Sequence, residues 1–548
     1  MPTVDRVDAV VVGAGATGSV AAMVLAEAGL EVLMLEAGPD LSWQQAFPGE
    51  PINTLRRITN LCSGKQRIQA HHPGYWKQNP NLYVDERLHP YTTTQNSPYL
   101  WTRGRQVGGK SLTWGGITLR LSDLEFKAGD RDGQGPSWPI GFADLDPYYS
   151  RLERLLGVHG KADGLEQLPD GCFLPPLPFT PGERHLGSEM ARQLGLPLIH
   201  SRGFALHHPS PSDPWPRSSA QGVTLARARA TGKLRLRCHA VVSHLRMDSH
   251  QNRAEGVVVV SGHTGHRDFI PAPLVVLCAS TIESVRILLH SSEEHRPGGL
   301  IDPSGCLGRY LMDHISTSRF FSIAGLPPTP TNVELSGAGS CFIPNTLHLH
   351  GDDGLGFIRG YGVWAAVQRF DPPAVLQRKA GQATGFLIGH GEVLPRWENH
   401  VMLDPDLRDA WGIPSPRISC RWSANEMAML AHMHNRMEEV VKAAGGTIQS
   451  FEDLFVLPLL EPVVKRNAAL RSSAAPPGYY VHELGGARMA TQSDQGVLNS
   501  WNQCWQAANV LVTDGACWPS AGWQSPTLTE MAITWRACEA AVRRLARG

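Results

Sequence analysis

The chain has 548 residues, of which 42% are hydrophobic and 18% charged, and it contains 56 Gly and 41 Pro. This composition predicts a loop-rich globular enzyme of two or more domains and excludes a disordered or fibrous chain. Fifty basic residues balance fifty acidic ones, and the sequence has no basic tract with interleaved aromatic residues. We therefore expect a small-molecule substrate and no nucleic-acid partner.

The cysteines and the apolar runs indicate where the protein works. The ten cysteines are scattered without a CxxC pair, and several lie in apolar runs such as LVVLCAS, a pattern that fits a reducing compartment. A strand-like run starts within a few residues of Met1, which leaves no room for a signal peptide, and no apolar run reaches the ~20 residues of a membrane span. We expect a cytoplasmic protein without a membrane span. The 23 histidines lack carboxylate or cysteine company at ligand spacing, so we expect no metal site.

The first organised stretch, residues 8–38, reads DAVVVGAGATGSVAAMVLAEAGLEVLMLEAG. Its β-branched run predicts a buried strand, Gly13, Gly15 and Gly18 predict a tight turn, and the small and apolar residues that follow predict a helix. The second strand ends at Glu36, 18 residues past the third glycine, where a carboxylate would bind an adenosine ribose. The glycines let the backbone approach a pyrophosphate, whose charge meets the helix N-terminus. Because Glu36 would repel a 2′-phosphate, the unit predicts FAD or NAD.

Later segments favour FAD. Residues 231–247, 254–262 and 273–291 look like further strands of the same domain, and the last of them runs into a helix that begins near Ala279 with small and polar residues. These segments lie about 180 residues from the N-terminal unit. A dinucleotide domain that is split in this way, with its last piece at the C-terminus, is more typical of flavoproteins than of nicotinamide enzymes.

Six motifs follow one another along the chain: the N-terminal fingerprint, GRQVGGKSLTWGG (104–116), ASTIESVRIL (279–288), GRYLMDH (308–314), HELGGARM (482–489) and NVLVTDGACWPSAGWQSPTLTEMAITWRA (509–537). Together they resemble the glucose-methanol-choline (GMC) oxidoreductase family from end to end. Two further segments, 132–158 and 391–414, look most similar to its bacterial and fungal branch, which oxidises sugars and glycosides. The resemblance implies an α/β fold, in which a Rossmann-like FAD-binding domain accompanies a discontinuous substrate-binding domain built on a mixed or antiparallel sheet.

The expected domains are interleaved along the chain. The FAD-binding domain comprises residues 1–45, 96–125, 215–315 and 485–548, and the lid and substrate-binding domain comprises residues 46–95, 126–214 and 316–484. Within the second domain, GYGVWAAVQRF and ATGFLIGHGEVLP alternate like strands, whereas residues 46–95 look like a long loop or lid. Gln368, His390 and Trp397 are side chains of the kind that hold a sugar, although such side chains are more often structural.

The segment VGGKSLTWGG would, by the same resemblance, run along the isoalloxazine ring. Gly108, Gly109 and Gly115 would let backbone amides approach the flavin without a Cβ clash. Some sugar-oxidising relatives carry a histidine two residues after the serine of this loop and bind the flavin covalently through it, but this chain has Thr113 at that position. We therefore expect noncovalent FAD.

The C-terminal stretch SPTLTEMAITWRACEAAVRRL has one apolar helical face, with Ser525 as the predicted N-cap and Pro526 in the first turn. If the start of this helix, at Pro526 and Thr527, faces the flavin pyrimidine edge, its partial positive charge would stabilise the anionic reduced flavin. The resemblance places Asp514 and Gly515 at the ribityl and pyrophosphate region of the cofactor.

Ser525 departs from the family pattern. Relatives usually present a second histidine or an asparagine at this position, to hold the substrate hydroxyl. Serine has a shorter reach, and capping the helix competes for its oxygen, so Ser525 either binds the substrate or only caps the helix. Gln524 beside it could substitute.

The stretch YVHELGGARM is the candidate catalytic centre. A zinc protease would need a second histidine at Gly486, so that class is excluded. His482 follows a strand-like run and precedes Gly485 and Gly486, which allow a sharp turn that presents the imidazole to a cavity. A histidine suits the role of base because its neutral form dominates near pH 7, and the resemblance places the family's base here. Glu483 would point to the opposite side, with Arg488 as a candidate partner.

These expectations combine into one function. We expect an FAD-dependent alcohol or sugar dehydrogenase or oxidase that removes the hydroxyl proton of a CH–OH group in a sugar, glycoside or related polyol and passes the hydride to flavin N5. The alternatives are a non-redox relative that keeps its flavin as a structural element and an inactive flavin-binding member of the family. The sequence leaves the electron acceptor open between oxygen, a quinone and a cytochrome.

Overall fold

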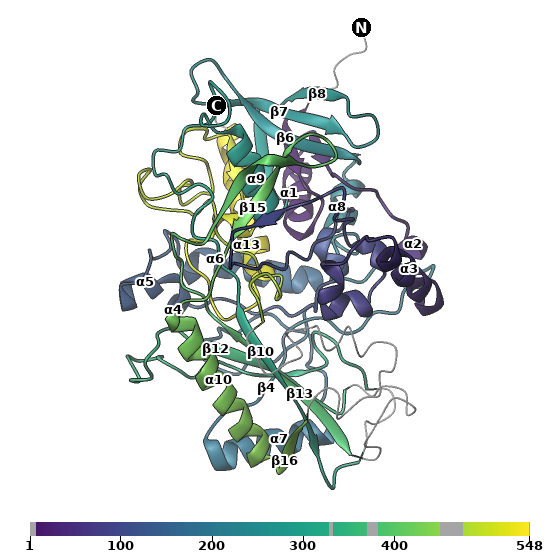
Figure 1. Ribbon diagram of the computed structural model, residues 1–548, viewed down its shortest axis with the longest axis vertical. Helices are drawn as coiled ribbons and strands as arrows, with labels where there is room; N and C mark the ends of the chain where they lie inside the picture. The colour runs from purple at the N-terminus through teal and green to yellow at the C-terminus, as the bar shows by residue number, and fades with distance from the viewer. Residues whose placement is uncertain (1–6, 328–332, 370–381, 450–474, 547–548) are drawn as a thin grey trace.

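The computed structural model describes residues 7–327, 333–369, 382–449 and 475–546. Two large sheets dominate it, one parallel and one antiparallel, and the antiparallel sheet lies toward the lower end of the long axis (Figure 1). Among the helices of the described residues, none is both long and apolar enough to cross a membrane.

The parallel sheet has five strands in the order β17-β9-β1-β2-β5. They are β1 (Ala9–Val12), β2 (Val32–Leu35), β5 (Leu234–Arg237), β9 (Leu274–Leu277) and β17 (Val510–Val512). The helices of this half are α1 (Ala16–Glu27), α8 (Thr224–Ala230), α9 (Thr281–Ser291) and α13 (Thr527–Leu545). Strands β1 and β9 are buried along their whole length, as β-branched strands covered on both faces are. The predicted Rossmann-like sheet, assembled from separate parts of the chain, is confirmed.

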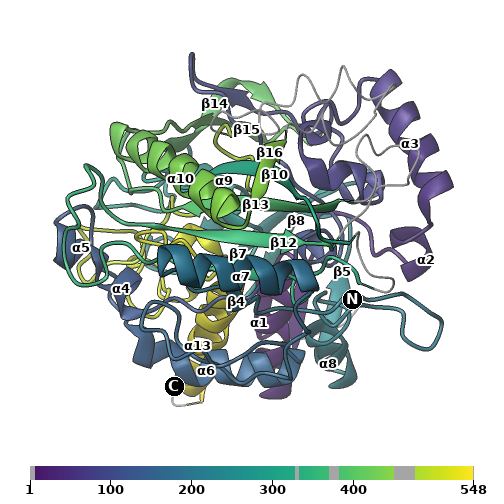
Figure 2. The same cartoon turned by 90° about the horizontal axis from the view of Figure 1, so that it is seen from below.

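The antiparallel sheet has six strands in the order β16-β10-β13-β12-β11-β4. They are β4 (Ile199–His200), β10 (Ile315–Ile323), β11 (Cys341–Ile343), β12 (Tyr361–Val367), β13 (Ala383–Gly391) and β16 (Gly446–Gln449). Strands β12 and β13 are the two strands that the alternating sequence predicts. Helices α7 (Pro181–Leu194) and α10 (Ala424–Ala443) lie side by side over one face of the sheet (Figure 2).

Alternation along these strands decides which side chains meet the helices. Phe321 of β10, Val363 of β12 and Leu387 of β13 belong to one buried cluster with Met433 and Met437 of α10. Successive residues of a strand point to opposite faces, so their neighbours in the sequence face the other side. That other face is left for the interior between the two halves.

Two smaller sheets complete the β-structure. One contains β6 (Ala240–Met247), β7 (Ala254–Ser261) and β8 (Arg267–Pro271), and the other contains β3 (Thr92–Thr93), β14 (His400–Arg408) and β15 (Pro414–Ser419). Short helices outside the N-terminal 95 residues include α4 (Asp123–Phe126), α5 (Ala128–Asp132), η4 (Gly109–Leu112) and η7 (Gly515–Cys517).

Two segments pack against a different half from the one that the sequence predicts. Val401 and Ile418 of the β14–β15 hairpin, together with Leu145 and Tyr149 of α6 (Phe142–Leu156), lie in the same core as the parallel sheet. Helix α6 contacts α13, and β14 contacts α9. The sequence assigns both segments to the lid and substrate-binding domain, but both pack against the half that contains the parallel sheet. The other predicted domain boundaries stay a prediction.

The predicted long loop at residues 46–95 is wrong in part, because it contains helical structure. The helices there are α2 (Trp43–Ala46), α3 (Glu50–Cys62), η1 (Gln69–His71), η2 (Pro73–Trp76) and η3 (Pro80–Leu82). Helix α3 buries a polar side chain and exposes apolar ones. Arg57 is buried and donates to the carbonyls of Tyr75 and Gln78. Leu55 and Ile58 are exposed. A search for an apolar buried face cannot find such a helix.

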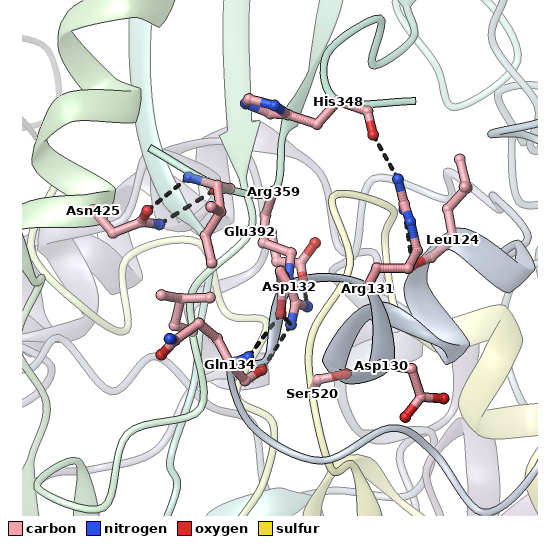
Figure 3. Close-up of polar contacts among 12 residues, drawn as sticks. Leu124, Asp130, Arg131, Asp132, Gln134, His348, Arg359, Glu392, Asn425 and Ser520 are labelled. Carbon is pink, nitrogen blue, oxygen red and sulfur yellow. Dashed lines mark hydrogen bonds and ion pairs between the residues drawn. The ribbon is translucent and has the colours of Figure 1, made fainter. Parts of the chain in front are cut away.

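A buried ion cluster fastens the α5 region to the antiparallel sheet (Figure 3). Arg359, just before β12, donates to the carboxylate of Asp132, to the carbonyl of Gln134 at 2.9 Å, and to Glu392 after β13. Burial raises the pKa of Glu392 to about 7, against the opposing effect of the Arg359 guanidinium. Nearby, Arg131 is exposed and donates to the carbonyl of His348 at 2.6 Å.

The cluster yields a stability prediction. We expect Arg359→Ala to lower the free energy of unfolding by about 3–5 kcal/mol, because the substitution leaves buried carboxylates without their cation. Arg131→Ala, the matched control, should cost no more than about 0.5 kcal/mol, as is usual for an exposed side chain. Urea unfolding of both variants with equal cofactor content tests this. Equal denaturation midpoints for the two variants would contradict the prediction.

Candidate active site

A cavity of about 1240 Å³ lies between the carboxyl edge of the parallel sheet and the face of the antiparallel sheet opposite α7 and α10. Its wall includes Val12 at the end of β1 and Cys278 just after β9, as well as residues of β10, β12 and β13. Ligands of doubly wound sheets bind at this carboxyl edge. The volume exceeds the roughly 300–1,000 Å³ of most small-molecule pockets, so the cavity has room for a dinucleotide and a small substrate together.

The first turn has the shape that its three glycines predict. Gly13 has a φ of +97°, and a Cβ there would lie 2.3 Å from the carbonyl oxygen of Cys278. A Cβ at Gly18 would lie 1.9 Å from the carbonyl oxygen of Gly13, so Gly18 serves the packing of α1 and does not line the cavity. Gly15 does line it, and a Cβ there would meet no atom of the described chain within 4 Å. The space in front of Gly15 is therefore open to a diphosphate.

Glu36 lies at the end of β2 in the cavity wall and is buried. Its Oε2 accepts a hydrogen bond from the amide of Ala14 and its Oε1 one from the amide of Gly38, both at 2.9 Å. Each carboxylate oxygen keeps a further lone pair. The carboxylate is thus oriented by the turn and can still accept hydrogen bonds from ribose hydroxyls.

The glycines of residues 104–116 divide into two kinds. Gly109 and Gly115 line the cavity, and a Cβ at Gly109 would lie 3.2 Å from the Cα of Gly15. Gly108 lies behind the wall with a φ of +94°, where a Cβ would come within 2.5 Å of Oε1 of Gln221. Gly108 therefore shapes the loop and does not face the cavity.

The N-terminal ends of three long helices meet the cavity. Ala279 and Thr281 at the start of α9 line it, as do Pro526 and Thr527 at the start of α13, and Gly15 is the N-cap of α1. Helix N-termini carry partial positive charge and unsatisfied amides, which together bind anions. The arrangement suits a phosphate-bearing cofactor with an anionic reduced form.

The strand end at β17 contributes one further oriented carboxylate. Asp514 lines the cavity and accepts hydrogen bonds from Ser284 Oγ at 2.5 Å and from the amide of Ala516 at 3.1 Å. Burial raises the pKa of Asp514 to about 6. Gly515 lies behind the wall, where a Cβ would come within 2.4 Å of Oγ1 of Thr281, so it permits close packing of the turn.

Two arginine side chains with unpaired hydrogen-bond donors test whether the residues of the cavity fit FAD. Nη1 of Arg103 and Nε of Arg105 are buried in residues that line the cavity and have no hydrogen-bond partner within the described chain. A guanidinium stays charged in a protein, and a buried donor without a partner costs free energy, so these atoms mark a place for an anion. Together with the open glycine turn and Glu36, they fit the dinucleotide part of FAD.

Ser525 does not cap α13. The N-cap of that helix is Pro526, without any side-chain cap hydrogen bond, and Ser525 is a buried residue of the cavity wall. The interpretation of Ser525 as the N-cap is therefore wrong, because the helix begins two residues later, at Thr527. Gln524 cannot take its place, since it lies outside the wall and donates to the carbonyl of Gln167 at 3.3 Å.

His482 reaches the cavity through a short antiparallel pairing with the chain that precedes β10. Met312 and Leu484 exchange two backbone hydrogen bonds of 2.8 and 3.0 Å. Positions two residues away from such a pair face each other on the same side of the ladder. This register brings His314 opposite His482, and the Nδ1 atoms of the two rings lie 2.7 Å apart.

The backbone after His482 makes the sharp turn that the two glycines predict. Gly485 has a φ of +85° and a Cβ there would lie 2.1 Å from the carbonyl oxygen of Tyr310, while at Gly486, with a φ of +98°, a Cβ would lie 2.5 Å from Val285 Cγ2. Larger residues are excluded at both positions. The turn is therefore packed tightly as well as bent.

Three histidines and a tyrosine gather around the pairing. The ring of His390 lies 6.1 Å from that of His314 and 6.5 Å from that of His482, and the ring of Tyr480 lies 4.1 Å from His390. Burial lowers the pKa of His314 to about 4, and it lowers the pKa values of His390 and His482 well below the ordinary range. All three imidazoles are therefore neutral near pH 7, the form that a general base requires.

Glu483 faces away from His482, as the sequence predicts, but its expected partner is wrong. Its Oε2 accepts from Nζ of Lys110 at 2.6 Å, whereas the guanidinium of Arg488 stacks 3.9 Å above the ring of Tyr310. Sequence reasoning missed Lys110, which lines the cavity. Its ammonium is brought to Glu483 by the fold alone, since the two residues are 373 positions apart.

The antiparallel sheet supplies the opposite wall with alternate residues. Those that line the cavity are Ser316, Thr317, Ser318, Phe320, Trp364, Phe386, Ile388 and His390. Their even numbers, Thr317 apart, follow from the period of two along a strand. His390 therefore lies in the cavity wall, where a substrate-binding residue would have to be.

The other two predicted sugar-binding residues lie elsewhere. Gln368 is buried outside the wall, where it accepts from the amide of Gly182 at 2.6 Å and donates to the carbonyl of Pro327. Trp397 is 44% exposed, does not line the cavity, and packs edge-on against Tyr310. The structure therefore does not bring these two residues to the cavity, because residue type alone does not tell which face of a strand or turn a side chain takes.

Within the described chain, no group of three or more His, Cys, Asp or Glu side chains is arranged to hold a metal ion.

Comparisons with known proteins agree with this geometry. Two models of GMC oxidoreductases match residues 7–316 and 395–534. The chain is 28% identical to 2-methyl-1,2-propanediol dehydrogenase of Mycolicibacterium austroafricanum, over 98% of this chain and 96% of that one. It is 24% identical to the fructose dehydrogenase large subunit of Gluconobacter japonicus, over 99% and 98%.

Solved structures show the same fold. The formate oxidase of Aspergillus oryzae RIB40 superimposes with a TM-score of 0.65 at 16% identity, over 99% of this chain and 98% of that one. The chain therefore belongs to the GMC oxidoreductase family of FAD-dependent enzymes that oxidise CH–OH groups.

Proposed function

We propose that this oxidoreductase acts on a hydroxyl group of a neutral sugar, glycoside or related polyol, with His482 as the general base. The observation that carries the proposal is the pairing of His482 with His314 at the cavity, where a neutral imidazole is held between the nucleotide-binding turn and the antiparallel sheet. Two of the relatives that the chain resembles are named for a diol and for a sugar.

The sheet wall supports a neutral substrate. Its lining residues are aromatic, aliphatic or carry hydroxyl groups, and none from β10, β12 or β13 is a carboxylate, an ammonium or a guanidinium. Trp364 and Phe386 offer flat faces for the C–H side of a sugar ring, and Ser316 and Ser318 can donate or accept hydrogen bonds. A substrate with a full charge would lose its hydration without gaining a partner on this wall.

The roles of the chain's own residues follow from their places. The turn at Gly13 and Gly15, the Glu36 carboxylate, and the unsatisfied donors of Arg103 and Arg105 would hold the dinucleotide. Bound FAD supplies the acceptor for the hydride. His482 takes the hydroxyl proton of the substrate, and the Ser525 hydroxyl, which is not engaged in capping, can hydrogen-bond the same oxygen.

The first prediction concerns the cofactor. The purified protein should be yellow, and acid precipitation should release its FAD into the supernatant, because Thr113 offers no covalent link. Gly15→Val should yield colourless protein, since a branched side chain would fill the space in front of the turn. Ala28→Val, at the exposed end of the same helix, should keep the flavin. Flavin that stays in the washed pellet, or a yellow Gly15→Val protein, would refute the respective claim.

The second prediction concerns the substrate. On anaerobic mixing, neutral pyranose sugars, glycosides and polyols should bleach the flavin absorbance, whereas choline, methanol and simple sterols should not. The same panel with oxygen present shows whether oxygen reoxidises the flavin. Bleaching by choline alone would overturn the assignment, and a flavin that no compound of the panel bleaches would favour a non-redox or inactive member of the family.

The third prediction concerns the base. His482→Ala should keep its FAD and fold but slow anaerobic flavin reduction by at least about a hundredfold, within the range that a general base contributes. Ser525→Ala should cost much less, because its hydroxyl only assists in orienting the substrate. Stopped-flow rates from about pH 6 to 9 provide the measurement. Reduction of fully loaded His482→Ala at the wild-type rate would place the base elsewhere.

A further inference from the structure

Both ring nitrogens of His314 make hydrogen bonds, and together these bonds determine which nitrogen of His482 carries the proton. Its Nδ1 lies 2.7 Å from Nδ1 of His482, and its Nε2 lies 2.5 Å from the carbonyl oxygen of Gly522. His314 is buried and stands outside the residues that line the cavity. It therefore acts on the substrate only through His482.

The carbonyl of Gly522 determines where the protons lie. A carbonyl oxygen only accepts hydrogen bonds, so Nε2 of His314 must carry a proton. A neutral imidazole has one proton, which leaves Nδ1 of His314 as an acceptor. Nδ1 of His482 is then the donor across the 2.7 Å contact, and its own Nε2 is left with a free lone pair.

We propose that His314 is a positioning residue that selects the tautomer of His482 in which Nε2 is the proton acceptor for the substrate hydroxyl. The proposal rests on the proposed function. It assigns the role that a carboxylate plays in other histidine-based sites to a neutral imidazole.

The backbone on both sides supports a fixed geometry. The carboxylate of Asp313 accepts from the amide of Gly478 at 2.7 Å and from the amide of His482 at 3.2 Å. The dipeptide Asp313-His314 therefore binds both the main chain and the side chain of His482. Thr281 Oγ1 bonds the carbonyl of the next residue, Glu483, which fixes the strand from its other side.

The proton step balances within these residues. The O–H bond of the substrate breaks and an N–H bond forms at Nε2 of His482, while Nδ1–H of His482 stays bonded to His314. The hydride of the same carbinol carbon, with its two electrons, goes to FAD as the oxidant of the family activity. The imidazolium so formed is stabilised by the lone pair of His314 Nδ1 and by the Gly522 carbonyl beyond it.

Two variants of His314 separate tautomer selection from packing. His314→Leu removes the acceptor, whereas His314→Gln keeps a carbonyl oxygen that can accept from His482 and an amide that can donate to Gly522. We expect anaerobic flavin reduction to fall at least about thirtyfold in His314→Leu and to stay within about tenfold of wild type in His314→Gln, within the general range of base catalysis. The substrate concentration that half-saturates the reduction rate should change by less than about threefold in both.

The control is another buried histidine. His244 on β6 bonds Ser243 Oγ through its Nδ1 at 3.1 Å and lies outside the cavity wall, so His244→Leu should reduce its flavin at the wild-type rate. The FAD content of each variant is measured first. Rates are compared only per bound flavin.

A spectroscopic readout tests the tautomer directly in the holoenzyme. With 15N-labelled histidine, the His482 signals are those that vanish in His482→Ala. They should show a protonated Nδ1 and an unprotonated Nε2 in the wild type, and a mixture or the reverse in His314→Leu. A wild-type His482 with its proton on Nε2 overturns the proposal even if no His314 variant folds.

The outcomes also distinguish this proposal from the proposed function. If no sugar or polyol bleaches the wild-type flavin, the proposed function fails. If the wild type is bleached and His314→Leu reacts at the wild-type rate, only the inference about His314 fails. Equal slowing of His314→Gln and His314→Leu likewise overturns tautomer selection, while rescue by His314→Gln alone supports it.

Discussion

The short backbone pairing between Met312 and Leu484 is the constraint on which the rest of the site depends. Strand β10 of the antiparallel sheet begins three residues after Met312. On the other side, the amide of Gly485 donates to the carbonyl of Gly515, just beyond the last strand of the parallel sheet. His482 is thus held by both halves of the molecule at once, so its distance to the nucleotide-binding turn and to the sheet wall is set by the packing of the two sheets.

The same backbone register places the imidazole side chains and the carboxyl side chains on different sides of the ladder. His314 and His482 share one side of the ladder, and Asp313 and Glu483 share the other. Burial, together with a smaller contribution from the neighbouring Glu483, raises the pKa of Asp313 to about 7, while Lys110 bonds Glu483 directly. These carboxyl groups thereby lie on the other side of the ladder from the two imidazoles, and Lys110, which bonds Glu483, lies in the cavity wall.

Local pattern was enough to predict the nucleotide-binding turn, the parallel strands, β12, β13 and the position of His482, because glycine spacing and strand alternation are short-range signals. Those same signals do not carry pairing across the chain. His314 is the last residue of the GRYLMDH motif, but its proposed role depends on its contact with His482, which is 168 residues away in the sequence. Lys110 lies 373 residues from Glu483 for the same reason. The sequence did not predict helix α3 because the buried face of this helix is polar. Ser525 was wrongly predicted to be the N-cap of α13 because the ends of helices can be placed from sequence only to within one or two residues.

If His482 is the base, as proposed, its neutral partner His314 affects how the proton is accepted. A buried carboxylate in the place of His314 would favour the imidazolium and so keep part of the enzyme in the wrong protonation state. Burial and the neighbouring imidazoles of His314 and His390 lower the pKa of His482, so His482 stays neutral near pH 7. In the proposed mechanism the imidazolium forms only when the proton is transferred, and the lone pair of His314 Nδ1 then stabilises it. The N-terminus of α13, in the cavity wall, carries the partial positive charge that would stabilise an anionic reduced flavin as the hydride arrives.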